Sequence, residues 1–135
     1  MICLDTNAVI AYLKGDPPRL VARFEREILQ AELALPVVAL FELRYGIAKS
    51  ARREENSDRL AIFLQLPITV WPFEPEDADE AGAIRAELER AGTSIGPYDV
   101  LIAGQARRRG AVVVTTNAGE FSRVPGLRTE DWAAH

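Results

Sequence analysis

The chain has 135 residues, of which 48% are hydrophobic and 27% are charged. A chain of this length and composition can bury the core of one globular domain, over residues 1–135, but it is too short to form a second domain. Its formal charge of −4 argues against nonspecific adhesion to nucleic acid, because such binding normally needs a surplus of lysine and arginine. The single cysteine, Cys3, excludes an intramolecular disulfide and a cysteine-based zinc cluster. The apolar runs are too short to span a bilayer, and we expect a cytoplasmic protein.

The first strand, within residues 2–7, carries the residue around which the sequence is organised. Its apolar residues lead to Asp5, and the polar Thr6 and Asn7 then come before a new apolar run. This is the pattern of a strand-to-helix turn in an α/β sheet, where ligands bind outside the carboxyl ends of the strands. A purely structural role, in which one of these side chains caps the next helix, stays open at this point.

Two helices are expected next, over residues 8–13 and from Arg19 onward, separated by a glycine and two prolines that cannot continue a helix. Their apolar residues recur at helical spacing. We expect most of this stripe in the core and part of it in a groove for a partner. The stripe consists of Val9, Ile10, Leu13, Leu20 and Phe24.

A short apolar run over residues 33–37 predicts a second strand, and residues 38–50 predict a helix that is apolar almost all round. Such a pattern indicates burial. Glu42 stands within this helix, and an unpaired buried carboxylate is costly. The sequence therefore predicts a cation, a metal ion or hydrogen-bond donors near Glu42, with a salt bridge to Arg44 or Arg85 as one alternative.

Further helices are expected over residues 51–66 and about 76–91, on either side of a strand at residues 68–71. On the second of these helices, Arg85 falls on the apolar stripe at helical spacing. The other members of that stripe are Ala78, Ala81 and Leu88. This spacing places Arg85 on the inward side of the helix and predicts that it pairs with a buried acid.

The next helix begins at Pro97, a residue well suited to the first helical position. Asp99 shares a face of this helix with small or apolar residues, and we expect it to point inward. A fourth strand is predicted at residues 111–115, a polar loop at 116–121 and an edge strand at 127–129. Strands that alternate with helices predict an α/β domain with a mostly parallel sheet and right-handed crossovers.

Elimination leaves carboxylates as the candidate catalytic groups. The only histidine, His135, stands at the end of the sequence, where we do not expect it to be held rigidly enough for triad or zinc chemistry. The glycine loops that hold nucleotide phosphates are missing. Asp5, Glu42 and Asp99 remain, each at a strand end or on a helix that can face one, and together they predict a site for Mg²⁺ or Mn²⁺. Ions bound there could activate water and hold a phosphodiester for hydrolysis.

Six segments spread over the chain form a distinctive set of motifs. They are residues 2–7 (ICLDTN), 41–46 (FELRYG), 84–88 (IRAEL), 95–103 (IGPYDVLIA), 115–117 (TTN) and 124–127 (VPGL). In composition and order this set closely resembles the PIN-domain toxins of the VapC type. The resemblance implies a PIN-like three-layer α/β domain, in which helices flank a central, mostly parallel sheet of four to five strands.

The same resemblance implies a function and partners. It implies a Mg²⁺-dependent endoribonuclease, with Mn²⁺ able to substitute, that is the toxin of a type II toxin–antitoxin pair. Such a toxin hydrolyses structured RNA, commonly tRNA, and inhibits translation. The implied partners are a VapB-type antitoxin, whose C-terminal segment wraps the toxin and blocks its site, and a second copy of the chain in a homodimer.

The resemblance also assigns site residues. Asp5, Glu42 and Asp99 match the metal-binding acids of the family, and Asn117 stands where many PIN domains have a fourth acid. We therefore expect catalytic roles for all four, with an amide at the fourth position that could ligate the metal or orient water. Supporting roles around them are expected for Thr6, Arg85, Thr115 and Glu120.

Three other functions fit the sequence less well. A phospho-receiver domain needs a phospho-acceptor aspartate after the middle strand, where this chain has Pro72 and Phe73. A phosphatase of the haloacid-dehalogenase type needs a second aspartate at the position of Asn7. A catalytically silent PIN scaffold that binds RNA or a protein partner stays as the alternative, although the three acids argue against it.

Overall fold

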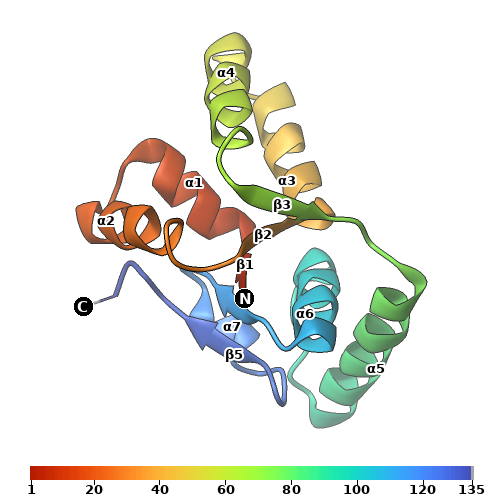
Figure 1. The fold of residues 1–135 in the computed structure, drawn as a ribbon. Coiled ribbons are helices and arrows are strands. Elements are labelled where there is room, and N and C mark those ends of the chain that lie inside the picture. Colours follow the sequence, from red (N-terminus) through yellow and green to blue (C-terminus); the bar gives the residue numbers. More distant parts are fainter. Residues whose placement is uncertain (135) are drawn as a thin grey trace.

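The computed structural model, which describes residues 1–134, contains five strands. They are β1 (Ile2–Leu4), β2 (Leu33–Pro36), β3 (Ile68–Trp71), β4 (Val112–Val114) and β5 (Arg128–Glu130). The strands form one sheet in the order β3-β2-β1-β4-β5 (Figure 1), and every adjacent pair is parallel. The expected α/β class is therefore confirmed, and the edge strand expected at 127–129 is present one residue later.

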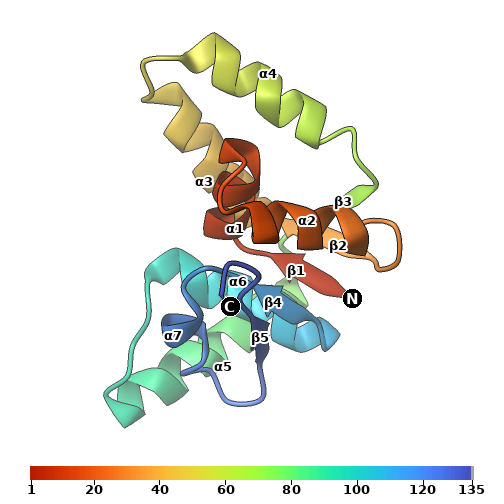
Figure 2. The same cartoon turned by 90° about the vertical axis from the view of Figure 1, so that its left-hand side faces the viewer.

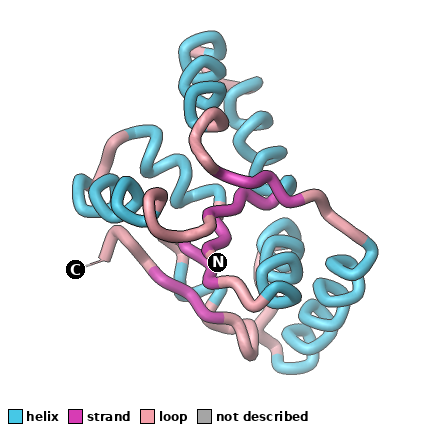
Figure 3. Tube along the Cα trace, in the orientation of Figure 1, coloured by secondary structure: helices cyan, strands magenta, loops and turns pink. Residues whose placement is uncertain are grey.

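Seven helices are found within residues 1–134. They are α1 (Thr6–Lys14), α2 (Pro18–Glu27), α3 (Val37–Ala48), α4 (Arg53–Phe63), α5 (Pro75–Ala91), α6 (Pro97–Arg109) and α7 (Ala118–Phe121). Figures 1 and 2 show α1 to α4 on one side of the sheet and α5 and α6 on the other. Figure 3 shows the strands gathered between these two layers. Within the described part of the chain, no helix combines the length and the apolar character that crossing a membrane requires.

The sheet is apolar on both faces because helices cover both faces. All four residues of β2, Leu33–Pro36, are buried. The central positions of the neighbouring strands, Cys3 and Leu4 in β1 and Val113 and Val114 in β4, are also buried. Cys3 is thus a core residue, and burial raises the pKa of its thiol.

The apolar stripe of α1 and α2 is divided between the core and the surface. Val9, Leu20 and Phe24 are buried in the core, whereas Ile10 is 36% exposed and Leu13 is partly buried. The expectation that most of this stripe packs inward is confirmed, and only its α1 members remain available for a partner.

The predicted burial of the third helix is wrong. Only Ala39 and Leu43 of α3 are buried, while Phe41 is 50% exposed and Tyr45 is 58% exposed. The reason is that α3 and α4 together project from the body of the domain, as Figure 2 shows, so that few elements cover α3. An apolar helix on such a projection leaves aromatic rings at the surface.

The predicted inward position of Arg85 is also wrong. The inward face of α5 consists of Asp77, Ala81, Ile84 and Leu88. It keeps Ala81 and Leu88 of the predicted stripe but replaces Ala78 and Arg85 by the residues directly before them, which turns the stripe by about 50° around the helix. The Arg85 side chain is 68% exposed and pairs with Glu89 at 3.6 Å. Because this pair is exposed, it contributes little to stability.

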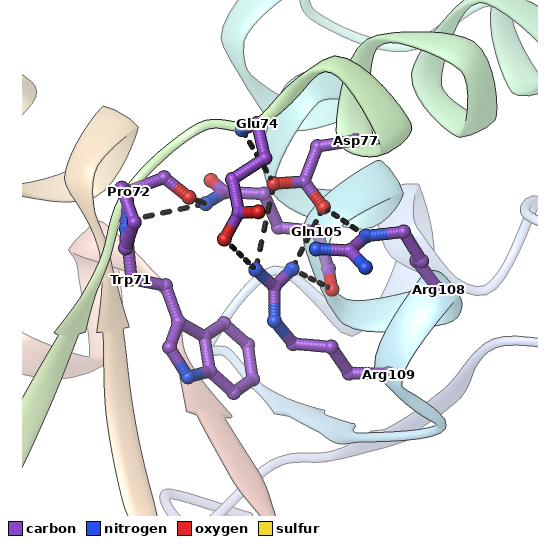
Figure 4. Close-up of polar contacts among 7 residues, drawn as sticks. All are labelled: Trp71, Pro72, Glu74, Asp77, Gln105, Arg108 and Arg109. Carbon is purple, nitrogen blue, oxygen red and sulfur yellow. Dashed lines mark hydrogen bonds and ion pairs between the residues drawn. The ribbon is translucent and has the colours of Figure 1, made fainter.

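A buried polar cluster, and not Arg85, ties α5 to α6 (Figure 4). The carboxylate of Asp77 is fully buried and accepts hydrogen bonds from Arg108 Nε at 2.6 Å and Arg109 Nη1 at 2.8 Å. Arg109 also lies over the ring of Trp71 at 4.5 Å, and Gln105 Nε2 donates to the Trp71 carbonyl oxygen at 3.3 Å. Burial alone would raise the pKa of Asp77, but the hydrogen bonds from the arginines and from the Glu74 amide outweigh it and lower the pKa.

A close backbone contact also joins α5 and α6. A Cβ atom added at Gly104 would lie 2.7 Å from the Cβ and 2.9 Å from the backbone nitrogen of Ala81. Glycine at this position therefore sets the distance between the two helices. Since α6 carries Asp99 at its start, this packing also fixes one side of the site described next.

The polar loop predicted at residues 116–121 contains the short helix α7 instead. Its last residue, Phe121, is fully buried and draws this segment against the sheet beside β5, which α7 contacts. The burial of one aromatic ring thus orders a segment whose polar composition suggested a loop.

Candidate active site

The candidate site lies where the chain changes direction within the sheet. From β1 the strand order runs to β2 and β3 on one side and to β4 and β5 on the other, and a ligand crevice forms at the carboxyl ends of strands at such a point. Asp5 follows β1 and Thr115 follows β4. Asp5 is 2% exposed, and the hydroxyl of the fully buried Thr115 donates to its Oδ2 at 2.8 Å.

Glu42 reaches the same crevice from α3. The hydroxyl of Thr6, the residue after Asp5, donates to Glu42 Oε1 at 2.8 Å. Within residues 1–134 Glu42 forms no ion pair, so neither Arg44 nor Arg85 is its partner. The hydrogen-bond donor that the sequence predicted for Glu42 is therefore Thr6, and this bond joins the start of α1 to α3.

Asp99 and Glu120 form a carboxyl pair on the other side of the crevice. The two carboxyls lie close enough that each shifts the pKa of the other. The backbone N–H of Gly96 donates to Glu120 Oε1, and Asn117 Nδ2 donates to Glu120 Oε2 at 2.6 Å. A Cβ atom at Gly96 would lie 3.1 Å from Asp99 Oδ2 and 3.4 Å from Glu120 Oε1, so glycine leaves space for the pair.

The acids at this edge of the sheet perturb one another. Burial raises the pKa of Asp5, repulsion from Glu42 adds to the rise, and the hydrogen bond from Thr115 opposes it. Burial, followed by repulsion from Asp5 and Glu120, raises the pKa of Asp99 to about 7. Donation from the Gly96 N–H, assisted by Asn117, lowers the pKa of Glu120. The proton of the carboxyl pair therefore resides on Asp99.

This donor set fits a hard divalent cation by its chemistry. Carboxylate oxygens are the ligands that Mg²⁺ and Mn²⁺ prefer, and a bound cation would relieve the repulsion that raises the pKa values of Asp5 and Asp99. In the described residues no three acidic side chains already stand in a ready-made metal cage. Glu42 and the Asp99–Glu120 pair would have to turn toward Asp5 to share an ion.

The structure places most of the sequence-predicted residues at one site. Asp5, Glu42 and Asp99 lie close enough for their charges to interact. Thr115 donates to Asp5, and Thr6 donates to Glu42. Arg85 does not join them.

Two of the expected residues, Asn117 and Glu120, are found together at the fourth position. Asn117 is exposed and donates to Glu120, and it is Glu120 that contacts Asp99. An acid, Glu120, thus stands beside Asp99 three residues after Asn117, and the catalytic role expected of Asn117 stays a prediction. Sequence reasoning also missed Gly96, although a glycine directly before the helix-starting Pro97 was a signal of a tight approach there.

Comparison with known proteins agrees with this geometry. The family model of the PIN domain matches residues 2–127. The tRNA(fMet)-specific endonuclease VapC of Shigella flexneri is 43% identical over 130 residues, which cover 96% of each chain.

Two solved structures have the same fold. VapBC2 from Rickettsia felis, bound to a DNA fragment from its promoter, matches with a TM-score of 0.91 at 34% identity, covering 98% of this chain and 99% of that one. DNA-bound VapBC from Salmonella typhimurium matches with a TM-score of 0.88 at 41% identity, covering 97% of each chain.

Proposed function

Because this chain belongs to the PIN domain family, with VapC-type proteins among its relatives, we propose that it is a Mg²⁺-dependent endoribonuclease. It acts as the toxin of a VapBC-type toxin–antitoxin pair, hydrolyses phosphodiester bonds of structured RNA, most simply tRNA, and thereby inhibits translation. The observation that carries this proposal is the convergence of four acids, Asp5, Glu42, Asp99 and Glu120, at the carboxyl ends of β1 and β4.

Each side chain of the site has a role that follows from its contacts. Asp5, Glu42 and Asp99 are the residues that would hold Mg²⁺ or Mn²⁺, and such an ion, when bound, polarises a phosphate oxygen and lowers the pKa of water. Thr115 donates to Oδ2 of Asp5 and thereby fixes the orientation of this carboxylate. Thr6 orients Glu42 in the same way.

The Asp99–Glu120 pair holds one proton, which Asp99 must release before it can bind a metal ion. Asp99 carries it at neutral pH and below, because its pKa is raised to about 7, and it must release this proton before the carboxylate can act as a metal ligand. Glu120 stays ionised because Gly96 and Asn117 donate to its two oxygens. Asn117 thus acts by positioning Glu120, and Glu120 supplies the acid that the sequence lacks at position 117.

The proposal is tested by incubating total RNA, and separately purified tRNA, with the antitoxin-free protein in Mg²⁺ and in EDTA. Discrete fragments are expected in Mg²⁺ only, and they should disappear with Asp5→Asn. Asp58→Asn, which changes an exposed acid of α4, is the matched control and should cut like the wild type. A folded, Mg²⁺-loaded protein that cuts no RNA would refute the proposal and favour the silent scaffold that binds RNA or a protein.

We propose a VapB-type antitoxin as the protein partner, since the Rickettsia felis and Salmonella typhimurium neighbours are VapBC complexes. A groove of about 380 Å³ between α1, α3 and α4 offers it an apolar surface that includes Ile10, Leu13 and Ile47. Adding the antitoxin should protect these segments of α1 and α3 from hydrogen exchange, and unchanged exchange would refute this location. A homodimer, which the family implies, is the expected state of the toxin in that complex.

A further inference from the structure

The surface beside the acids carries aromatic side chains that neither the core nor the chemistry above uses. Phe41 and Tyr45 project from α3, and Tyr98, which is 45% exposed, projects from the start of α6. Phe41 directly precedes Glu42, and Tyr98 directly precedes Asp99. Each of these two rings is therefore attached next to an acid of the site.

The rings form one continuous surface with a cation at its end. The rings of Phe41 and Tyr98 are 5.4 Å apart at an angle of 61°, which is an edge-to-face packing that fixes both orientations. Tyr45 lies one helical turn beyond Phe41, and Lys49 Nζ lies 4.7 Å from the Tyr45 ring centroid. We call these four residues the aromatic face. They line an open groove of about 660 Å³ that also reaches Glu42.

Gly46 lies in the floor of this groove, and packing does not require it. It stands within α3, where glycine is less favourable than alanine. A Cβ atom at Gly46 would meet nothing within 4 Å, and the residue has no positive φ angle. The missing side chain leaves room in this groove for a ligand to approach the backbone of α3 closely.

The charge of this side of the molecule also suits an anion. The chain has only two lysines, Lys14 and Lys49, and they line adjoining grooves on either side of Gly46. Arg59 lines the first of these grooves as well, although it is paired with Glu55 at 2.8 Å. In a protein with a net charge of −4, these cations line the two grooves that extend from Glu42 along α3.

We propose, building on the ribonuclease function above, that the aromatic face binds unpaired bases of the RNA next to the bond that is cut. Bases stack on the exposed rings of Phe41 and Tyr45, the backbone passes over Gly46, and Lys49 contacts a phosphate. Single-stranded RNA is bound in this way by aromatic side chains that stack bases beside a basic groove. The substrate class is therefore an unpaired RNA segment, such as a loop, and not a continuous double helix.

The stacking is tested by steady-state cleavage of a single-stranded RNA oligonucleotide that the wild type cuts. Tyr45→Ala and Phe41→Ala should each raise KM by about 5-fold to 100-fold, the range that loss of one stacked base produces, with kcat nearly unchanged because ground-state binding is lost. Tyr45→Phe keeps the ring and should retain the wild-type KM. Ile62→Ala, which removes a 65% exposed side chain of α4, is the matched control.

The groove floor is tested by two glycine substitutions of the same kind. Gly46→Ala should raise the melting temperature by about 2–5 °C and yet raise KM, since the added methyl group obstructs the RNA. Gly82→Ala on α5, where a Cβ atom also meets nothing within 4 Å, should raise the melting temperature similarly and leave KM unchanged.

A binding assay separates this inference from the function on which it rests. The Asp5→Asn variant is mixed with the same oligonucleotide containing 2-aminopurine, whose fluorescence falls when it stacks. Quenching that Tyr45→Ala abolishes supports the aromatic face, whether or not the wild type cuts RNA. If the wild type cuts RNA but Tyr45→Ala and Gly46→Ala leave both quenching and KM unchanged, the inference is overturned and the ribonuclease function stands. Loss of antitoxin binding or of the homodimer by Phe41→Ala, with KM unchanged, would assign the face to a protein partner instead.

Discussion

Asp99→Asn is expected to stabilise the protein while it abolishes RNA cleavage. Burial and repulsion from Asp5 and Glu120 raise the pKa of Asp99 from its ordinary value of 3.8 to about 7. Between these pH values the folded protein keeps a proton that the unfolded chain has released, so the free energy of unfolding falls as the pH rises. The uncharged amide of asparagine does not incur this loss.

The size of the effect follows from the size of the pKa shift. A shift from 3.8 to about 7 corresponds to a ceiling of about 4 kcal/mol. Asp99 is only partly buried, and water screens the repulsion, so we expect about half of the ceiling, about 2 kcal/mol. For a domain of this size that is an increase of about 6–10 °C in melting temperature.

The assay is thermal or urea unfolding of the wild type and of Asp99→Asn at pH 8 and at pH 4, in EDTA. The variant should be more stable at pH 8 and nearly equal to the wild type at pH 4, where the folded wild type holds the proton of Asp99 and the unfolded chain has released only part of it. Asp58→Asn, an exposed control, should stay within about 0.5 kcal/mol of the wild type at both pH values. Equal stabilities of Asp99→Asn and the wild type at pH 8 would refute the proposed burial and repulsion of the Asp99 carboxylate. Full RNA cleavage by the folded variant would remove Asp99 from the site.

Three further substitutions test other parts of the structure. Thr115→Val removes the donor that opposes the raised pKa of Asp5, so the pH at which RNA cleavage begins should move upward; an unchanged pH–rate profile contradicts this role. Gly104→Ala places a methyl group 2.7 Å from the Cβ of Ala81 and should cost about 1–3 kcal/mol in unfolding free energy, as measured in urea. Asp77→Asn breaks a buried pair with two arginines and should cost about 3–5 kcal/mol at pH 7. Because the pKa of Asp77 is lowered, this cost should shrink as the pH falls below about 4, and a cost independent of pH would exclude the ion pair as its cause.

The parts of the site that could be predicted from the sequence share a local signal. Asp5 ends an apolar strand, and Asp99 follows a helix-starting proline. The spacing of the apolar residues around them therefore sufficed to predict that Asp5 lies at a strand end and that Asp99 points inward. Glu42 was conspicuous because it interrupts an apolar helix. The fourth acid could not be found in this way, because Asn117 and Glu120 are neighbours in the sequence, and only the fold shows which one reaches Asp99.

The errors have equally physical causes. Arg85 was misplaced because the stripe of α5 includes the polar Asp77, which a search for apolar spacing skips. The arginines that make its burial tolerable lie about 30 residues away in the sequence. The exposure of Phe41 and Tyr45 was missed because apolar character predicts burial only where another element covers the helix.

The sequence by itself determined the strands, six of the seven helices found within residues 1–134 and the α/β class, because hydrophobic periodicity and turn residues act over a few neighbouring positions. It also singled out Asp5, Glu42 and Asp99 as candidate site acids. The tertiary structure alone decided which donors hold those acids: Thr115 lies 110 residues from Asp5, and Thr6 lies 36 residues from Glu42. It also decided the charge state of the site, since the pKa of Asp99 depends on burial and on carboxylates from three other segments of the chain. Such contacts arise only when strands and helices distant in the sequence meet at one edge of the sheet.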